Sequence, residues 1–190
     1  MAGEPEPAPW RRLTRRRVYE NPWMAVDEDL VELPNGLTTI YGVVRCGECV
    51  GMLPFPDPEH VVLVRQWRYI AGRATWEMPT GGVHEGETVE QAAQRELGEE
   101  AGVHAGRLTP VTSYATSKSV VDETAHLFLA HDLTAAMGAP DDTEFLQCHT
   151  VAFDDALQMV LTGEIVDSMT IIAILFMRST TDRRAAARLA

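Results

Sequence analysis

Cysteines are scarce in this chain, and long apolar segments are missing from it. Cys46, Cys49 and Cys148 are its three cysteines, which favours a reducing compartment over a disulfide-stabilised secreted domain. No apolar run reaches the roughly 20 residues of a membrane-spanning helix, and no apolar segment follows the N-terminal arginines to complete a secretory signal. We therefore expect a cytoplasmic protein with no membrane partner.

Basic residues are also in short supply. The 16 Lys and Arg residues are outnumbered by 28 Asp and Glu residues, which gives a formal net charge of −12. Such a charge repels polyanions, so we expect no nucleic acid partner. An anionic substrate would have to be bound by local arginines or through metal cations.

Cys46 and Cys49 have the C-x-x-C spacing that occurs in zinc and redox sites. A structural zinc ion needs four ligands, and Cys148 with His149 is the one pair left to complete the set. A glycine turn between two small residues is the alternative interpretation of the same segment.

The order of predicted elements indicates an α/β protein with a mixed sheet covered by helices. Alternating apolar residues predict two strands within 26–44, joined by a type I′ turn at Asn35–Gly36, and a second strand pair at 50–55 and 60–67. The remaining predicted elements are a short strand at 74–82, a helix beginning at Thr88, strands at 108–116, 124–133 and 144–153, and helices at 154–163 and 167–179.

The helix after Thr88 has clear signals at both ends. Thr88 and Gln91 have the spacing of a capping box at the N-terminus, and Gly102 suits the left-handed position that follows the C-terminus. Between them, apolar residues recur at intervals of four and predict a buried stripe: Val89, Ala93 and Leu97.

The same helix carries three glutamates within about one turn. Glu96 and Glu100 share a face with Glu99 beside them, and like charges at this spacing repel by about 0.2–0.5 kcal/mol. An exposed acidic face, partly offset by Arg95, is the simpler interpretation. A divalent cation such as Mg²⁺ would remove the repulsion, because it binds carboxylate oxygens and keeps positions for water and phosphate.

The spacing of these residues resembles the Nudix box, the signature of the Nudix hydrolase family. Its defined positions match the following residues: Gly81, Glu87, Arg95, Glu96, Leu97, Glu99, Glu100, Gly102 and Val103. The resemblance implies a Nudix-type α/β/α sandwich with a mixed β-sheet, preceded by an N-terminal β-hairpin region. We accordingly expect a disordered N-terminus at 1–12, N-terminal β-strands for dimerisation and the substrate pocket at 13–45, the Nudix hydrolase domain at 46–180, and a C-terminal tail at 181–190.

The resemblance also implies a hydrolase that cleaves the diphosphate of a nucleoside derivative, with Mg²⁺ or Mn²⁺ as cofactor. By position in the box, Glu96 and Glu100 would be the principal metal ligands, Glu99 an auxiliary ligand and the Thr80 carbonyl a further ligand. Glu99 and Glu100 would also be catalytic residues. Arg95, the remaining catalytic residue of the box, would orient the glutamates through a salt bridge rather than touch the substrate.

The segments VVLVRQWRY and WEMPTGG resemble the ADP-ribose and nucleoside-diphosphate-sugar branch of the family. This branch implies a homodimer whose substrate-binding residues include Arg65, Trp67, Arg68 and Glu77. On a strand, Arg65 and Trp67 would lie on the face opposite to Arg68, and Trp67 could stack on a nucleobase or pack into the core. Segment 117–123 lacks the proline common in ADP-ribose enzymes, so another nucleotide sugar remains open as the substrate.

In related enzymes the general base is a carboxylate on a loop before a late strand. The acidic segment GAPDDTEF fits this description, which makes Glu144 the first candidate and Asp142 the second, with Asp122 and Glu123 in reserve. A metal-bound hydroxide assisted by a box glutamate is the alternative.

We therefore expect a metal-dependent hydrolase that converts a nucleoside-diphosphate sugar such as ADP-ribose to a nucleoside monophosphate and a sugar phosphate. One alternative is a Nudix hydrolase of a dinucleoside polyphosphate or a modified nucleotide. Another is a sensing module that binds a nucleotide without cutting it. The complete set of glutamates argues against the sensing module, which would have no reason to retain their mutual repulsion.

Overall fold

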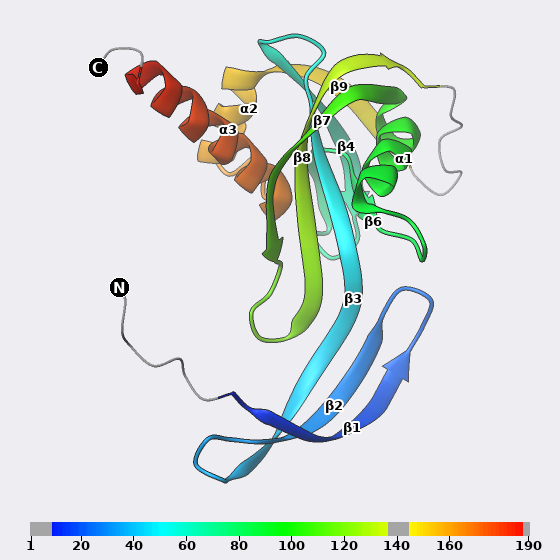
Figure 1. Cartoon of the computed structure of the whole chain (residues 1–190). Coiled ribbons are helices and arrows are strands. Elements are labelled where there is room, and N and C mark those ends of the chain that lie inside the picture. The colour runs from blue at the N-terminus through cyan, green and yellow to red at the C-terminus, as the bar shows by residue number, and fades with distance from the viewer. Residues whose placement is uncertain (1–8, 137–144, 188–190) are drawn as a thin grey trace. The chain divides into compact units, whose positions relative to one another are not determined.

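The computed structural model describes residues 9–136 and 145–187, with side chains described up to residue 180. Strands and helices follow one another along the chain as shown in Figure 1. The strands are β1 (Arg11–Glu20), β2 (Ala25–Glu32), β3 (Thr38–Pro54), β4 (His60–Arg68), β5 (Arg73–Glu77), β6 (Thr80–Gly82), β7 (Val103–Ala115), β8 (Val121–Ala135) and β9 (Leu146–Ala152). The helices are α1 (Val89–Ala101), α2 (Phe153–Leu161) and α3 (Ser168–Ala187).

The chain forms two compact units. Unit 1 comprises Met1–Gly47 and Ala115–Thr124, and unit 2 comprises Glu48–Tyr114 and Ala125–Ala190. Strand β3 passes from the first unit into the second. In the part of the chain that the structure describes, no helix combines the length and apolar character needed to cross a membrane.

Unit 1 contains a ladder of ion pairs between β1 and β2. In the antiparallel register, four arginines lie directly opposite four acidic residues: Arg11–Glu32, Arg15–Asp29, Arg16–Glu28 and Arg17–Asp27. Each pair forms a salt bridge with an N–O distance between 2.6 and 3.0 Å. Opposite charges in directly facing positions favour this register over its neighbours. The disorder expected for 1–12 therefore does not extend to Arg11 and Arg12, which pair with β2.

The turn between β2 and β3 differs from the predicted type I′ turn. A type I′ turn needs a positive φ at both central residues, whereas Gly36 has a φ of 81° and Asn35 is not among the residues with positive φ. The Gly36 amide donates to the Leu33 carbonyl at 2.9 Å, which makes Pro34 and Asn35 the central residues. Proline fixes its own φ near −65°, and it therefore favours a type I turn with glycine following.

The predicted α/β architecture is confirmed, but the strands belong to two sheets. The larger sheet has the order β1–β2–β3–β8–β7, with β6 pairing with β3, and the smaller has the order β5–β4–β9. The predicted pairing of 50–55 with 60–67 is wrong, because 50–54 lie on β3 in the larger sheet and 60–67 lie on β4 in the smaller one.

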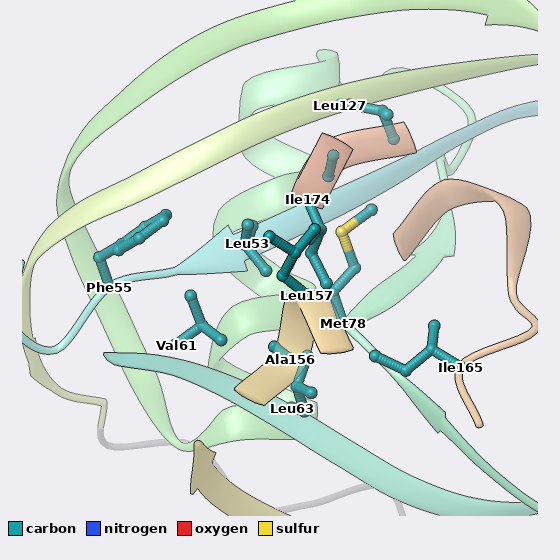
Figure 2. Packing of buried hydrophobic residues seen from close by; sticks show 11 residues of the cluster. Leu53, Phe55, Val61, Leu63, Met78, Leu127, Ala156, Leu157, Ile165 and Ile174 are labelled. Carbon is teal, nitrogen blue, oxygen red and sulfur yellow. The ribbon is translucent and has the colours of Figure 1, made fainter. Parts of the chain in front are cut away.

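Two hydrophobic clusters occupy opposite faces of the central strands in unit 2. On β8, Leu127 belongs to one cluster and the next residue, Phe128, to the other, as alternation along a strand requires. The first cluster, shown in Figure 2, packs α2 and α3 against β3 and β4. The second packs α1 against β3, β7 and β8. Helices thus cover both faces, which is the predicted α/β/α sandwich.

Helix α3 extends further than predicted. Its start is as expected, because the Asp167 carboxylate accepts the Thr170 amide at 2.7 Å in the manner of an N-cap. The helix then continues to Ala187. Residues 181–187 are therefore helical and do not belong to a separate tail.

The C-x-x-C segment lies within β3 and does not form a turn. Gly47 has a φ of 88° there, a conformation that favours glycine and locally interrupts a strand. The three cysteines form no disulfide.

Candidate active site

The candidate site is organised by α1 and its caps. The Thr88 hydroxyl accepts the Gln91 amide at 3.2 Å, and the Gln91 side chain accepts the Thr88 amide at 2.8 Å, so the predicted capping box is confirmed. Gly102 ends the helix with a φ of 64°. Ala93 and Leu97 are fully buried, and this stripe fixes the rotation of the helix about its axis. The directions of its glutamates are fixed with it.

Two of the three clustered glutamates, Glu96, Glu99 and Glu100, are buried. Glu96 is 6% exposed and Glu100 is 3% exposed, whereas the Glu99 side chain is 35% exposed. The interpretation of an exposed acidic face is therefore wrong for Glu96 and Glu100. Buried carboxylates require hydrogen bonds or opposite charges, and Arg95 supplies both to one of them.

Arg95 directs all of its guanidinium N–H groups at the site. It binds Glu87 through two bonds of 3.0 Å, Glu96 at 2.6 Å, Glu99 at 3.0 Å and the Gly82 carbonyl at 2.8 Å. A guanidinium has five N–H donors, so this set uses them all. The bonds to Glu87 raise the pKa of Arg95, and in return they hold the pKa of Glu87 below its ordinary value. This arrangement fits a residue that orients carboxylates and does not grip substrate.

Glu100 and Glu96 lie against the chain segment that precedes the helix. The Thr80 amide donates to Glu100 Oε2 at 2.7 Å. At Gly81, an added Cβ would lie 1.9 Å from Glu96 Oε1, a distance that no real side chain could occupy. A side chain at position 81 would therefore displace the Glu96 carboxylate, which packs directly on the backbone there. Cys148 of β9 adds a hydrogen bond from its thiol to the Glu100 carbonyl at 2.9 Å.

The four predicted substrate-binding residues lie on two faces of the smaller sheet. Arg68 binds Glu77 through Nε at 2.9 and 3.0 Å, and Glu77, 4% exposed, also accepts the Thr75 hydroxyl. The pair with Glu77 raises the pKa of Arg68. Position 77 faces 64 across the ladder, so Glu77 shares a face with Arg68. Arg65 and Trp67 lie on the opposite face, as the predicted alternation requires.

Trp67 and Phe145 line a groove at the end of this sheet. Trp67 is 65% exposed and Phe145 is 91% exposed, so packing of Trp67 into the core is excluded. The groove has a volume of about 310 Å³, and Arg65, Gln66, Ala74 and Gln147 complete its lining. Arg65 also stacks over the Trp76 ring, with its guanidinium carbon 5.5 Å from the ring centre. Phe145 was not among the predicted substrate-binding residues, because a single aromatic residue after an acidic segment forms no distinctive sequence pattern.

Comparison with known proteins places this geometry in a family. The model of the NUDIX domain matches residues 47–168, and that of the nucleoside diphosphate sugar hydrolase N-terminal domain matches residues 10–44. The chain belongs to the Nudix family. It is 31% identical over 170 residues to the ADP-ribose pyrophosphatase of Bacillus subtilis, covering 88% of this chain and 92% of the relative. It is 30% identical, with the same coverage, to the methanol dehydrogenase activator of Bacillus methanolicus.

A solved structure confirms the Nudix fold. The crystal structure of an ADP compounds hydrolase superposes with a TM-score of 0.84, covering 95% of this chain and 98% of that one at 21% sequence identity. At this identity the likeness concerns the fold. With the glutamates of α1 intact, the family assignment makes this protein a Nudix pyrophosphohydrolase.

The donor groups of the Nudix box fit a hard divalent cation. Glu96, Glu99 and Glu100 offer carboxylate oxygens and Thr80 a backbone carbonyl, which are the ligand types that Mg²⁺ prefers. Within 9–136 and 145–187, no three His, Cys, Asp or Glu side chains are grouped to hold a metal ion, and Arg95 engages Glu96 and Glu99. A cation bound here would compete with Arg95 for these two carboxylates.

The predicted general base belongs to a segment between the two described parts of the chain. Glu144 and Asp142 both lie outside the described residues. Of the reserve candidates, Asp122 belongs to unit 1, where it accepts a hydrogen bond from Arg45. Glu123 belongs to the same unit.

Proposed function

We propose that this Nudix hydrolase cleaves the diphosphate of ADP-ribose, releasing AMP and ribose 5-phosphate. The observation that carries the proposal is the excess of negative charge at α1. Four carboxylates gather there, of which Glu96 and Glu100 are buried, and Arg95 is the guanidinium that binds three of the four. The similarity to the ADP-ribose pyrophosphatase of B. subtilis supports the choice of substrate.

Some residues of the Nudix box would bind the cation, and others hold the cation-binding carboxylates in position. Glu96, Glu99, Glu100 and the Thr80 carbonyl would hold Mg²⁺ or Mn²⁺. When bound, the cation would screen the diphosphate, orient it and lower the pKa of a coordinated water. Arg95 keeps three of the carboxylates in place through four of its five hydrogen bonds. Glu144 would accept a proton as general base.

Residues on both faces of β4 would bind the rest of the substrate. An exposed indole offers a flat surface on which a nucleobase can stack, so Trp67 and Phe145 would bind the adenine. Arg65 would supply a positive charge next to them. Arg68 and Glu77 form an ion pair on the other face of β4, and from there Arg68 would bind the diphosphate.

We further propose that the protein is a cytoplasmic homodimer formed through unit 1. Large apolar side chains are exposed on this unit: Trp10, Val18, Tyr19, Trp23, Leu37 and Ile40. Where such side chains form a contiguous patch, they mark a surface that another chain covers. Size-exclusion chromatography with light scattering would show twice the mass of 21.0 kDa, and a monomer at micromolar concentration would contradict this part of the proposal.

The substrate is tested by a panel of diphosphates in the presence of Mg²⁺. ADP-ribose, GDP-mannose, UDP-glucose and diadenosine polyphosphates are incubated with the protein, and the products are separated by ion-exchange chromatography. AMP and ribose 5-phosphate in equal amounts would support the proposal. Turnover confined to diadenosine polyphosphates would assign another substrate class, and binding without turnover would indicate a sensing module.

A further inference from the structure

Thr170 is a buried polar residue far along the chain from the Nudix box. Its side chain is 0% exposed, and its hydroxyl has two partners. The Met78 amide donates to Thr170 Oγ1 at 2.9 Å, and the hydroxyl lies 2.6 Å from Asp167 Oδ2. Because Met78 donates its own hydrogen, the Thr170 proton is directed at Asp167. Both bonds therefore have a fixed direction.

The amide of Met78 depends on this hydroxyl. Met78 is fully buried in the two-residue link between β5 and β6, where no ladder partner is available. A buried backbone N–H without an acceptor costs about as much as a lost hydrogen bond. Asp167 is itself fixed, because it caps α3 through the Thr170 amide. The link between β5 and β6 is thus hydrogen-bonded to the first turn of α3.

The link leads directly into the Nudix site. Glu77, which precedes the link, forms an ion pair with Arg68. The Pro79 carbonyl accepts a hydrogen bond from the Met52 amide at 3.0 Å. Thr80 after it donates its amide to Glu100. A shift of the Met78 backbone would therefore move Thr80 away from Glu100.

We infer that Thr170 is a positioning residue for the metal site. Through Met78 it sets the place of the Thr80 backbone, and through that backbone it sets the Glu100 carboxylate. Thr170 touches neither substrate nor cation. The inference rests on the proposed function in so far as Glu100 and Thr80 hold the cation.

The test compares Thr170→Val with Thr170→Ser. Valine keeps the shape and removes the hydroxyl, whereas serine keeps the hydroxyl and loses the methyl group. Ile174→Val is the matched control, because Ile174 is a fully buried residue one turn further along α3 and has no polar contact. The readouts are Mn²⁺ affinity of the free protein by calorimetry, hydrogen exchange of the Met78 amide, and kcat and KM with ADP-ribose.

Thr170→Val is expected to weaken Mn²⁺ binding about tenfold and to lower kcat to a similar extent, as other residues that support metal ligands do. The Met78 amide should exchange faster, and KM for ADP-ribose should stay unchanged. Thr170→Ser should return Mn²⁺ affinity to within about twofold of the parent. Ile174→Val should lower Tm without changing Mn²⁺ affinity.

Parental Mn²⁺ affinity in a folded Thr170→Val protein would overturn the inference, and so would equal losses in Thr170→Val and Ile174→Val at matched Tm. If Thr170→Val does not fold, Asp167→Ser decides instead: serine still caps the helix but is too short to hold the hydroxyl. Weakened Mn²⁺ binding in that variant supports the inference, and parental binding overturns it. Absence of ADP-ribose turnover in the parent protein would refute the proposed substrate, while Mn²⁺ affinity would still test Thr170.

Discussion

Two networks of arginine and carboxylate groups occur in this protein, and they differ in charge balance. In unit 1, the buried carboxylates of Asp27 and Asp29 are bound by Arg15, Arg17 and Arg45. At α1 in unit 2, Arg95 binds three carboxylates, and Glu100 accepts a hydrogen bond from the Thr80 amide. Arg17 and Arg45 also bind Glu20 and Asp122, so the first network has one carboxylate in excess, whereas the second has three.

The smaller carboxylate excess in unit 1 fits a structural role, and the larger excess at α1 fits the proposed metal site. The ladder in unit 1 is neutralised by its own arginines and has no need of a ligand. The cluster at α1 has one guanidinium bound to three of its four carboxylates, and the proposed cation would add positive charge to this site of reduced polarity. Substitutions in the two networks should therefore have effects of different kinds.

The largest expected effect is that of Glu100→Gln. Loss of a carboxylate ligand should lower kcat at least about 100-fold, while the nearly isosteric amide should preserve the fold. Steady-state hydrolysis of ADP-ribose with Mg²⁺ measures the loss, and circular dichroism checks the fold. Glu28→Gln, in an exposed pair of the ladder, is the matched control and should keep parental turnover. Full activity of Glu100→Gln would remove Glu100 from the metal site.

Arg95→Lys should have the next largest effect. Lysine retains the charge but has three donors in place of a planar fork, so the contacts to Glu87, Glu96 and Glu99 cannot all be kept. We expect kcat to fall about 10- to 100-fold, the range seen when a residue that orients metal ligands is changed. Arg16→Lys makes the same exchange in the ladder and should leave kcat unchanged. Equal kcat values for both variants would show that charge alone matters at position 95.

Trp67→Ala should weaken substrate binding and leave the rate of the chemical step unchanged. Loss of an aromatic stacking partner costs about 0.5–1.5 kcal/mol, so KM for ADP-ribose should rise roughly 2- to 13-fold with kcat unchanged. Tyr69→Ala is the control, because Tyr69 is 93% exposed and does not line the groove. A fall in kcat without a change in KM would place Trp67 outside the substrate site.

The smallest expected effect is a pH-dependent change in stability at Glu87. Arg95 holds the folded-state pKa of Glu87 below its ordinary value, so the stabilisation is present at neutral pH and is lost as the pH falls through the folded pKa. Glu87→Gln should therefore lower Tm by about 2–4 °C at neutral pH, and the difference from the parent should shrink below about pH 4. Thermal unfolding at several pH values measures it, and a difference independent of pH would refute this linkage.

Local signals in the sequence predicted most of the helical site. The capping box at Thr88, the stripe through Leu97 and the stop at Gly102 depend on neighbours three or four residues away, and all three are present as predicted. The face shared by Arg65 and Trp67 follows from strand alternation in the same way. These features need no knowledge of the tertiary fold.

Features that depend on distant residues were not predictable. The assignment of 50–54 and 60–67 to different sheets is decided by β8 and β9, which follow more than 50 residues later. The ladder in unit 1 depends on the alignment of the arginines of β1 with the acidic residues of β2, which the arginines alone do not reveal. Proline at position 34 changed the turn because it acts one residue before the Asn-Gly pair.

The central claim is that the carboxylates at α1 bind a divalent cation. Titration of the protein with Mn²⁺ at neutral pH, followed by calorimetry, tests this claim most directly. The parent should take up Mn²⁺ with saturation, whereas Glu100→Gln should take up little and Glu28→Gln as much as the parent. If the parent takes up neither Mn²⁺ nor Mg²⁺, with or without AMP present, the carboxylates of α1 are not a metal site.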